Sequence, residues 1–347
     1  MKVLKFGGTS VGSAQRMKEV AKLITDGEQK IVVLSAMSGT TNTLVEISDY
    51  LYKKNPEGAN EIINRLEAKY KQHVNELYST DEYKQKTQEF IKAQFDYIRS
   101  YTKDIFTLFE EKVILAQGEL ISTNMVTNYL QEQGVNAILL PALEFMRTDK
   151  NSEPDPVYIK EKLAAQLEIH PDAEIYITQG FICRNAYGEI DNLQRGGSDY
   201  TASLIGAAVN ASEIQIWTDI DGMHDNDPRI VDKTSPVRHL HFEEAAELAY
   251  FGAKILHPTC VQPAKYANIP VRLLNTMEPT APGTLISNDT EKGKIKAVAA
   301  KDNITAIKIK SSRMLLAHGF LRKVFEIFES YQTSIDMICT SEVGVSV

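Results

Sequence analysis

The chain has 347 residues, of which 43% are hydrophobic and 24% are charged, and its formal net charge is -8. This length is typical of about two domains, and the acidic balance argues against a nucleic-acid or acidic-membrane partner, because no basic stripe dominates. No apolar stretch is long enough to span a bilayer, and the N-terminus lacks a signal-peptide pattern. Cys183, Cys260 and Cys339 lie far apart without C-x-x-C spacing, so we expect a cytoplasmic protein.

The first elements predict an α/β domain. Residues 2–6 and 30–39 are typical of buried strands, and residues 14–24 carry an apolar stripe at helical spacing. A glycine-rich turn joins the first strand to the helix. Strand, glycine turn, helix and strand in this order predict a parallel sheet.

Residues 46–112 interrupt this pattern. They are charged, contain a single proline and a single glycine, and repeat apolar residues at helical spacing. We predict a helical hairpin inserted in the α/β domain, with a turn near residues 79–83. We expect it to cover a face of the sheet or to pack against another subunit.

The α/β pattern then returns. We predict strands at 134–142, 174–184 and 212–223, and helices at 198–210 and 242–254. Residues 275–287 mark the closing edge of this first domain, and residues 288–296 form a polar linker.

A second unit begins near residue 299. It has the pattern of a strand, an amphipathic helix, a strand and the start of another strand. About 45 residues are too few to be stable alone. We therefore expect this unit either to dock on something or to belong to a truncated version of a longer protein.

The opening glycine turn, in "KFGGTSVG", fits neither common phosphate-binding motif. Gly7 and Gly12 have Walker A spacing, but Ser13 stands at the lysine position, and a dinucleotide fingerprint does not fit either. Gly7 and Gly8 would still let backbone N–H groups approach an anion at a helix start, with Lys5 supplying a cation from the strand. A tight turn with an exposed lysine explains residues 3–12 equally well.

A second glycine turn, "RGGSDYTA", precedes a helix for which we predict Ser198 or Asp199 as the N-cap. An arginine before paired glycines, here Arg195, is a good clamp for a carboxylate or phosphate, although an ordinary helix cap is the alternative. Two such turns suggest two anions, a nucleotide phosphate chain and an acidic substrate.

Other polar residues carry weaker signals. The four aspartates of residues 217–229 lack EF-hand spacing, and a solvated acidic turn after a strand end is their simplest interpretation. Glu119 and Lys254 are lone charges among apolar residues and need a partner or a route to the surface. His239 and His241 precede a helix and do not suggest a zinc site. We find no side-chain motif for a metal.

Taken in order, the segments "KFGGTSV", "VVLSAMSGTTN", "GELIS", "GFI", "RGGSDYTA", "WTDIDG", "DPR", "FGAKILHP" and "PGTLI" resemble those of the aspartate kinases, in the amino-acid kinase family. The resemblance covers essentially the whole chain, although Gln194 replaces the family's glycine. It implies an amino-acid kinase fold over residues 1–293, with a mainly parallel central sheet sandwiched by helices. It also implies that residues 299–347 are an incomplete first ACT domain.

The resemblance implies the reaction of ATP with L-aspartate to give ADP and 4-phospho-L-aspartate, with Mg²⁺, the first step toward lysine, threonine and methionine. The β-carboxylate attacks phosphorus directly, so no enzyme nucleophile is required. Catalysis should then be mostly positioning and stabilisation by cations.

The resemblance also assigns roles. Lys5 would be the main transition-state cation, Gly8 a backbone donor beside Gly7 and Thr9, and Asp199 would orient Lys5. Glu119 would pair with the substrate ammonium. The remaining substrate residues would be Ser35, Thr41, Arg195 and Ser198. The nucleotide residues would be Lys5, Gly7, Gly8, Thr9, Thr218, Asp219, His224, where the family often has tyrosine, Arg229 and Lys254.

Regulation by lysine is a further expectation from the resemblance. Matching positions of lysine-sensitive members are Met314, Phe320, Leu321, Asp336, Ser341 and Glu342, although Ala317 replaces a serine there. The intact protein would be a homodimer.

Two rival functions stay open on the sequence. The first is a kinase for another acid, such as glutamate, acetylglutamate or carbamate. Glu119 argues for a free amino group, because an acetylated substrate has no ammonium to bind. The second is a non-catalytic amino-acid sensor, which loss of Lys5 or Asp199 would have favoured, yet both are present.

Overall fold

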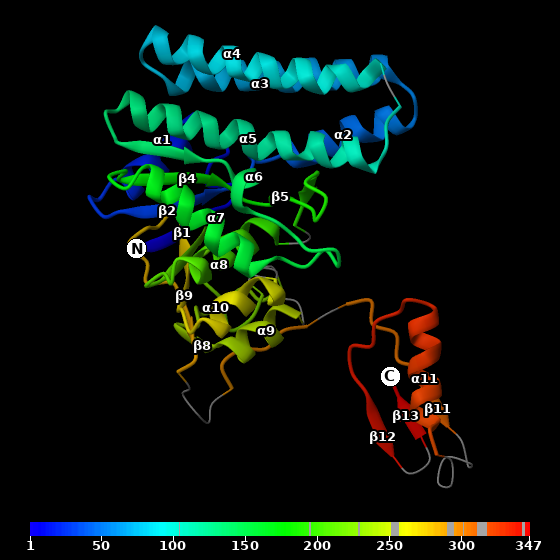
Figure 1. Cartoon of the computed structure of the whole chain (residues 1–347). Helices are drawn as coiled ribbons and strands as arrows, with labels where there is room; N and C mark the ends of the chain where they lie inside the picture. The colour runs from blue at the N-terminus through cyan, green and yellow to red at the C-terminus, as the bar shows by residue number, and fades with distance from the viewer. Residues whose placement is uncertain are drawn as a thin grey trace. The chain divides into compact units, whose positions relative to one another are not determined.

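The computed structural model describes residues 1–103, 105–193, 196–227, 230–250, 257–289, 295–300, 302–310, 318–341 and 344–347. The chain divides into two compact units, Met1–Ala299 and Ala300–Val347. The larger unit is an α/β sandwich, and the smaller one contains an antiparallel sheet and a helix (Figure 1).

A mainly parallel sheet forms the centre of the larger unit, with the strand order β3-β4-β2-β1-β7-β9-β10-β8. The β9–β10 pair is antiparallel, and the other described pairs of this sheet are parallel. The predicted fold of this unit, a mainly parallel central sheet between helices, is therefore confirmed. The strands are β1 (Lys2–Phe6), β2 (Lys30–Leu34), β3 (Ala137–Leu140), β4 (Ile175–Gln179), β7 (Ile214–Thr218), β8 (His239–His241), β9 (Val271–Asn275) and β10 (Thr284–Ser287).

Strand β1 sends alternate side chains to opposite faces of the sheet, as the period of two along a strand requires. Leu4 and Phe6 enter one hydrophobic core with helix α1 (Ala14–Ile24). Val3 enters the other core with helices α7 (Pro156–Ile169) and α8 (Gly197–Ala208). Lys5 has the parity of Val3, so its side chain leaves the sheet on the α8 face.

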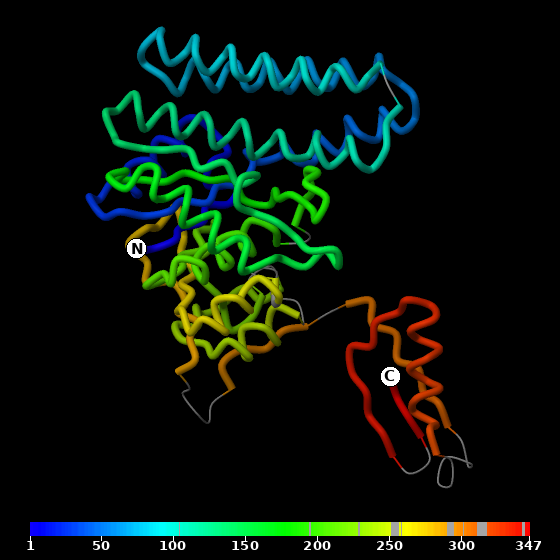
Figure 2. The backbone as a smooth tube through the Cα atoms, viewed as in Figure 1, coloured from blue at the N-terminus to red at the C-terminus, as the bar shows by residue number. Residues whose placement is uncertain are grey.

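The predicted helical hairpin consists of α3 (Pro56–Leu77) and α4 (Asp81–Ser100), which we call the inserted hairpin. We expect a hairpin that covers the sheet to lie directly on the strands, and this one does not, so that expected role is wrong. Figures 1 and 2 show it as an outer layer over α2 (Thr40–Tyr52) and α5 (Leu108–Glu132), and these two helices separate it from the strands.

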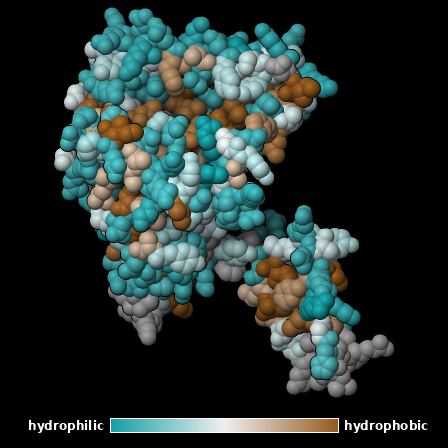
Figure 3. All heavy atoms as spheres, viewed as in Figure 1, coloured by the Kyte–Doolittle hydropathy of each residue, from teal (hydrophilic) through white to brown (hydrophobic). Residues whose placement is uncertain are grey.

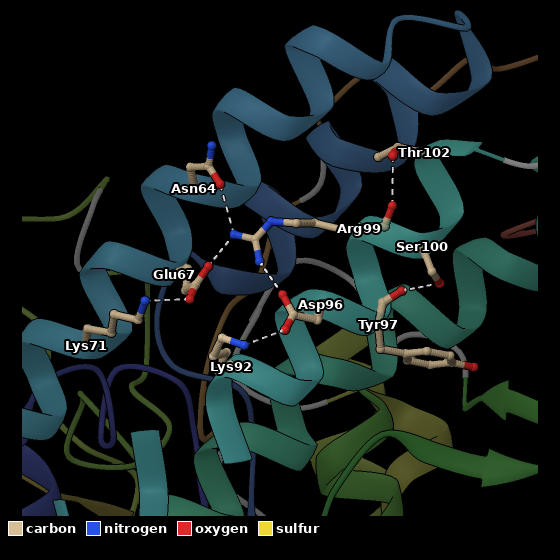
Figure 4. Close-up of polar contacts among 9 residues, drawn as sticks. All are labelled: Asn64, Glu67, Lys71, Lys92, Asp96, Tyr97, Arg99, Ser100 and Thr102. Atoms are coloured by element: carbon tan, nitrogen blue, oxygen red, sulfur yellow. Dashed lines mark hydrogen bonds and ion pairs between the residues drawn. The ribbon is translucent and has the colours of Figure 1, made fainter. Parts of the chain in front are cut away.

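Polar contacts join the two helices of the inserted hairpin (Figure 4). Arg99 on α4 pairs with Glu67 on α3 and donates to Asn64 Oδ1 over 2.8 Å, while Lys71 Nζ lies 2.7 Å from Glu67 Oε1. Burial would raise the pKa of Glu67, but hydrogen bonds from Lys71 and Arg99 outweigh it and lower that pKa. The ring of Tyr70 meets Phe95 at 5.9 Å beside this cluster.

The single strand predicted at 174–184 is wrong. Strand β4 ends at Gln179, and β5 (Ile182–Arg184) pairs with β6 (Ile190–Asn192) in a separate hairpin. Phe181 has a φ of 69° at the break, which an extended strand does not allow. The chain therefore leaves the central sheet at Gly180–Phe181.

The remaining helices of the larger unit follow the predicted pattern only in part. The helix predicted at 242–254 is α9 (Phe242–Tyr250), and residues 251–256 lie outside the described part. Helix α7, with its Asp155 cap and following proline, was not predicted. The short helices are α6 (Ala142–Phe145), η1 (Tyr101–Lys103), η2 (Pro258–Val261) and α10 (Gln262–Tyr266).

The smaller unit has the predicted order of strand, helix, strand and strand. Its elements are β11 (Lys308–Lys310), α11 (Phe320–Ser330), β12 (Cys339–Ser341) and β13 (Gly344–Ser346), with the antiparallel strand order β11-β13-β12. Val324 is buried, whereas Leu321, Phe325 and Ile327 are exposed. Figure 3 shows apolar side chains gathered on the surface of this unit.

Candidate active site

A cavity of about 370 Å³ lies beyond the carboxyl ends of β1 and β2. In α/β sheets this edge is the usual place for ligands. Helix α5 and the first turn of α8 also contribute to its walls. The predicted residues that line the cavity are Lys5, Gly8, Ser35, Thr41, Glu119, Ser198 and Asp199.

Lys5 and Asp199 form an ion pair inside this cavity. The Lys5 Nζ and Asp199 Oδ1 atoms are 2.7 Å apart, and only 10% and 13% of the two side chains are exposed. Strand alternation sends Lys5 toward the α8 face, where Asp199 occupies the first turn of α8. The ammonium therefore faces the cavity rather than open solvent.

Gly8 packs tightly against the loop that follows β2. A Cβ atom at Gly8 would lie 2.8 Å from the carbonyl oxygen of Ala36, and the N–H of Ser38 donates to the Gly8 carbonyl over 3.1 Å. Residues 35–42 comprise the turn after β2 and the first turn of α2, and this segment, here called the substrate loop, is thus held against the glycine turn. No larger residue fits at Gly8 without a shift of backbone.

The backbone N–H of Gly7 is used inside the protein. It donates to the carbonyl oxygen of Trp217 on β7 over 3.3 Å. Gly7 is therefore occupied as a donor in this structure, and it does not line the cavity. The sequence did not reveal this contact because β7 is more than 200 residues away along the chain.

Glu119 is a buried carboxyl group on α5 that lines the cavity. Its Oε1 atom accepts a hydrogen bond from the Ala36 N–H over 3.2 Å, whereas its Oε2 atom is buried and accepts none among the described residues. Burial raises the pKa of Glu119 to about 8. A buried carboxylate needs a cation or a further donor, so this oxygen is ready to bind one from a ligand.

Helix α8 begins differently from the prediction. Its N-cap is Gly196, with a φ of 74° and no side-chain cap, so the prediction of Ser198 or Asp199 as the cap is wrong. Their side chains are used elsewhere, because Ser35 Oγ donates to Ser198 Oγ over 3.0 Å and Asp199 pairs with Lys5. The glycine cap leaves both side chains facing the cavity.

Of the other predicted nucleotide residues, the described Thr9, Thr218, Asp219 and His224 do not line this cavity. Thr218 ends β7, whose Trp217 pairs with Phe6 of β1, so Thr218 and the exposed Asp219 lie at the same sheet edge as Lys5. His224 Nδ1 shares a 2.8 Å hydrogen bond with Thr234 Oγ1. Thr9 follows Gly8 in the opening turn.

Several predicted residues fall outside the described part of the chain. They are Arg195, Arg229, Lys254, Met314 and Glu342.

The other predicted lysine-site residues belong to the smaller unit. Phe320 and Leu321 form the first turn of α11, the exposed Asp336 precedes β12, and Ser341 ends β12.

Sequence reasoning had not assigned a role to several cavity residues. Besides the predicted Ser35 and Thr41, further residues of the substrate loop line the cavity. Phe181, with its positive φ at the break after β4, also lines it. A polar, glycine-bearing turn after a buried strand was the available signal for the loop. The unassigned lining residues are Ala36, Met37, Ser38, Gly39, Asn42, Phe181, Gly196 and Gly197.

The described residues show neither a metal cluster nor a membrane-spanning helix. Those residues contain no group of three or more His, Cys, Asp or Glu side chains that would hold a metal ion by themselves. Among the helices in the described ranges, none is long and apolar enough to cross a membrane.

Comparison with known proteins shows what this chain is similar to. The model of the amino acid kinase family matches residues 1–275. Aspartokinase 1, chloroplastic, of Arabidopsis thaliana is 38% identical over 99% of this chain and 62% of its own length, so the chain spans less than two thirds of that relative. Lysine-sensitive aspartokinase 3 of Escherichia coli is 35% identical over 99% of this chain and 77% of its own length. The crystal structure of E. coli aspartokinase III in complex with aspartate and ADP matches with a TM-score of 0.86 and 34% identity, covering 100% of this chain and 78% of that one.

Proposed function

This chain belongs to the amino acid kinase family, within the aspartokinases, and we propose that it transfers the γ-phosphoryl group of ATP to the β-carboxylate of L-aspartate. The products are ADP and 4-phospho-L-aspartate. One observation carries the proposal: a single cavity combines the largely buried Lys5–Asp199 pair with a buried oxygen of Glu119 that has no partner among the described residues. The similar E. coli enzyme, in complex with aspartate and ADP, supports both substrates.

The reaction requires little acid–base chemistry. A carboxylate is ionised at neutral pH, so its oxygen forms the bond to the γ-phosphorus directly. The bond from that phosphorus to the β–γ bridging oxygen breaks, and ADP leaves with the electron pair. Two anions must be brought together, so the protein contributes mainly position and positive charge.

Lys5 supplies the positive charge at the transferring group. Asp199 holds the Lys5 ammonium at 2.7 Å and keeps it directed into the cavity. The N–H groups of Gly8 and Thr9, in the turn between β1 and α1, are the backbone donors for phosphoryl oxygens. Gly7 gives the turn its shape, since its own N–H is occupied by Trp217.

Glu119 selects a substrate with a free amino group. An ammonium ion beside its buried Oε2 atom would stabilise the ionised carboxylate that burial otherwise disfavours. Ser35, Thr41 and Ser198 complete the pocket, and Arg195 is the proposed clamp for a substrate carboxylate.

The nucleotide and its metal complete the proposal. Thr218, Asp219, His224, Arg229 and Lys254 would hold the rest of the nucleotide. Mg²⁺ in proteins commonly binds through one or two carboxylates together with substrate phosphates. Asp199 in the cavity fits this requirement, and the ion would offset the charge of the phosphates.

A coupled assay of ADP release tests the function. We expect turnover with L-aspartate and much less with L-glutamate, acetylglutamate or carbamate. N-acetylaspartate is the matched control substrate, because it keeps both carboxylates and loses the ammonium. Turnover with acetylated acids in preference to aspartate would contradict the role of Glu119, and no turnover with any acid would favour an amino-acid sensor.

Regulation by lysine is a separate part of the proposal. The smaller unit would be an incomplete ACT domain, with Phe320, Leu321, Asp336 and Ser341 among the lysine-binding residues. The lysine-sensitive E. coli relative supports this. We also propose a homodimer for the intact protein, and a cytoplasmic location in keeping with its widely spaced cysteines. Lysine titration of the aspartate assay checks the regulatory part, and an unchanged rate at millimolar lysine would count against it.

A further inference from the structure

We propose that the inserted hairpin is a working part of the active site, because Tyr70 on α3 positions the substrate loop through Thr40. This inference rests on the proposed aspartate kinase function. Tyr70 does not line the cavity. It is a positioning residue, acting on the loop residues that do.

The contact is a buried hydrogen bond. Tyr70 OH and Thr40 Oγ1 are 2.9 Å apart, and the two residues are only 1% and 2% exposed. Thr40 is the first residue of α2, and its neighbours Gly39 and Thr41 both line the cavity. Tyr70 therefore fixes the substrate loop at its last turn, from behind the cavity wall.

Thr40 is also held from the side of α5. A Cβ atom at Gly118 would lie 3.3 Å from Thr40 Cγ2 and 2.7 Å from Ala36 Cβ, so the loop packs closely on the helix residue that precedes Glu119. Burial, and to a lesser extent the Glu119 carboxylate, raise the pKa of Tyr70. Tyr70, Thr40 and Glu119 thus lie in one buried region.

The inserted hairpin holds Tyr70 in place. Phe95 on α4 packs on the Tyr70 ring. One turn further along α4, Arg99 pairs with Glu67, as Figure 4 shows, and Glu67 lies one turn before Tyr70 on α3. Lys69, next to Tyr70, donates to the carbonyl oxygen of Ser38 over 3.4 Å. Both contacts from α3 to the substrate loop thus start from a segment that α4 fixes.

Loss of the Tyr70 hydroxyl should affect substrate binding more than chemistry. It would leave the Thr40 hydroxyl buried without this partner, which favours loop conformations other than the bound one. Binding would then have to order the loop. In the described part of the chain, Tyr70 contacts neither Lys5 nor Asp199, and these two residues keep their own ion pair, so the phosphoryl-transfer step should change little.

Tyr70→Phe tests the proposal, with Tyr78→Phe as the matched control. Tyr78 immediately follows α3, is 3% exposed, and donates its hydroxyl to the Met125 carbonyl over 2.7 Å, away from the loop. We expect Tyr70→Phe to raise the KM for aspartate about tenfold, with kcat within about twofold of wild type. The KM for aspartate in Tyr78→Phe should stay at the wild-type value.

Removing both partners provides a second measurement. Thr40→Val alone leaves the Tyr70 hydroxyl unpaired, whereas Thr40→Val combined with Tyr70→Phe leaves no orphaned hydroxyl. We expect the double variant to bind aspartate no more weakly than either single variant, because the two positions are coupled. Additive losses in KM would show that they act independently and would overturn the proposal.

Hydrogen exchange of the unliganded protein tests whether Tyr70 orders the substrate loop, and it does not require turnover. Amides of the substrate loop should exchange about tenfold faster in Tyr70→Phe and at the wild-type rate in Tyr78→Phe. Equal loop exchange in the two variants would overturn the positioning role. If the wild-type chain phosphorylates no acid, the proposed function fails, but this exchange experiment still tests Tyr70.

Discussion

Glu119→Gln separates the electrostatic cost of the buried carboxyl group from its use in binding. The Glu119 pKa is about 8, against 4.5 for a solvated glutamate. At about 1.4 kcal/mol for each pH unit, ionising it in the empty site costs about 5 kcal/mol more than in the unfolded chain. Glutamine has the same shape and keeps an acceptor for the Ala36 N–H, but it never ionises.

The sign of the pH dependence follows from the raised pKa. The folded protein holds this proton up to about pH 8, whereas the unfolded chain releases it near pH 4.5. The stability gained from the proton is complete below the lower value and is lost as pH rises toward the upper one. Relative to Glu119→Gln, the wild type should therefore lose about 3 kcal/mol of unfolding free energy between about pH 6 and about pH 9.

Urea denaturation of both proteins at the two pH values measures this difference. Glu67→Gln is a control of opposite sign, because the Glu67 pKa is lowered and its stabilising effect disappears only in acid. Calorimetry should also show that Glu119→Gln weakens aspartate binding about 10- to 100-fold. A stability difference that stays constant between the two pH values would refute the reasoning about burial, and unchanged aspartate affinity would refute the ammonium contact.

Three further substitutions test the two glycine turns and their lysine. Lys5→Ala should lower kcat at least about 100-fold with the circular dichroism spectrum preserved, and near-normal turnover would remove Lys5 from the transition state. Gly8→Ala should lower the melting temperature and raise the KM for ATP, because the new methyl group would meet the Ala36 carbonyl at 2.8 Å; an unaltered KM would mean that the turn adapts freely. Gly196→Ala should destabilise the protein more than Gly134→Ala. Both glycines have positive φ, but only at Gly196 would the new methyl group also clash with neighbouring side chains. Equal melting temperatures of the two variants would show that backbone strain accounts for the whole loss of stability.

The parts of the site that local sequence determines could be predicted. Lys5 and Gly8 belong to one short turn, and the strand and helix that flank it have clear periodicity, so β1 and α1 have the predicted bounds. The substrate loop follows a strand of five buried residues, which is an equally local signal. Glu119 was recognisable as a lone charge among apolar residues.

The parts that depend on distant contacts could not be predicted. The break at Phe181 goes against the high strand propensity of its neighbours, because tertiary packing decides the conformation of that residue. The N–H of Gly7 is occupied by a carbonyl from β7. Tyr70 has the helical spacing of a core residue, and only the folded arrangement reveals that its hydroxyl reaches Thr40.

The position of β1 in the middle of the sheet has a consequence for biosynthesis. The ribosome makes β1 before the other strands of this sheet, and β2 can pair with it early, but its other neighbour is β7, which begins at Ile214. Until β7 leaves the exit tunnel, the edge of β1 that will pair with it stays open, with unpaired N–H and C=O groups among apolar side chains. Another strand can pair wrongly with such an edge, and chaperones can bind it.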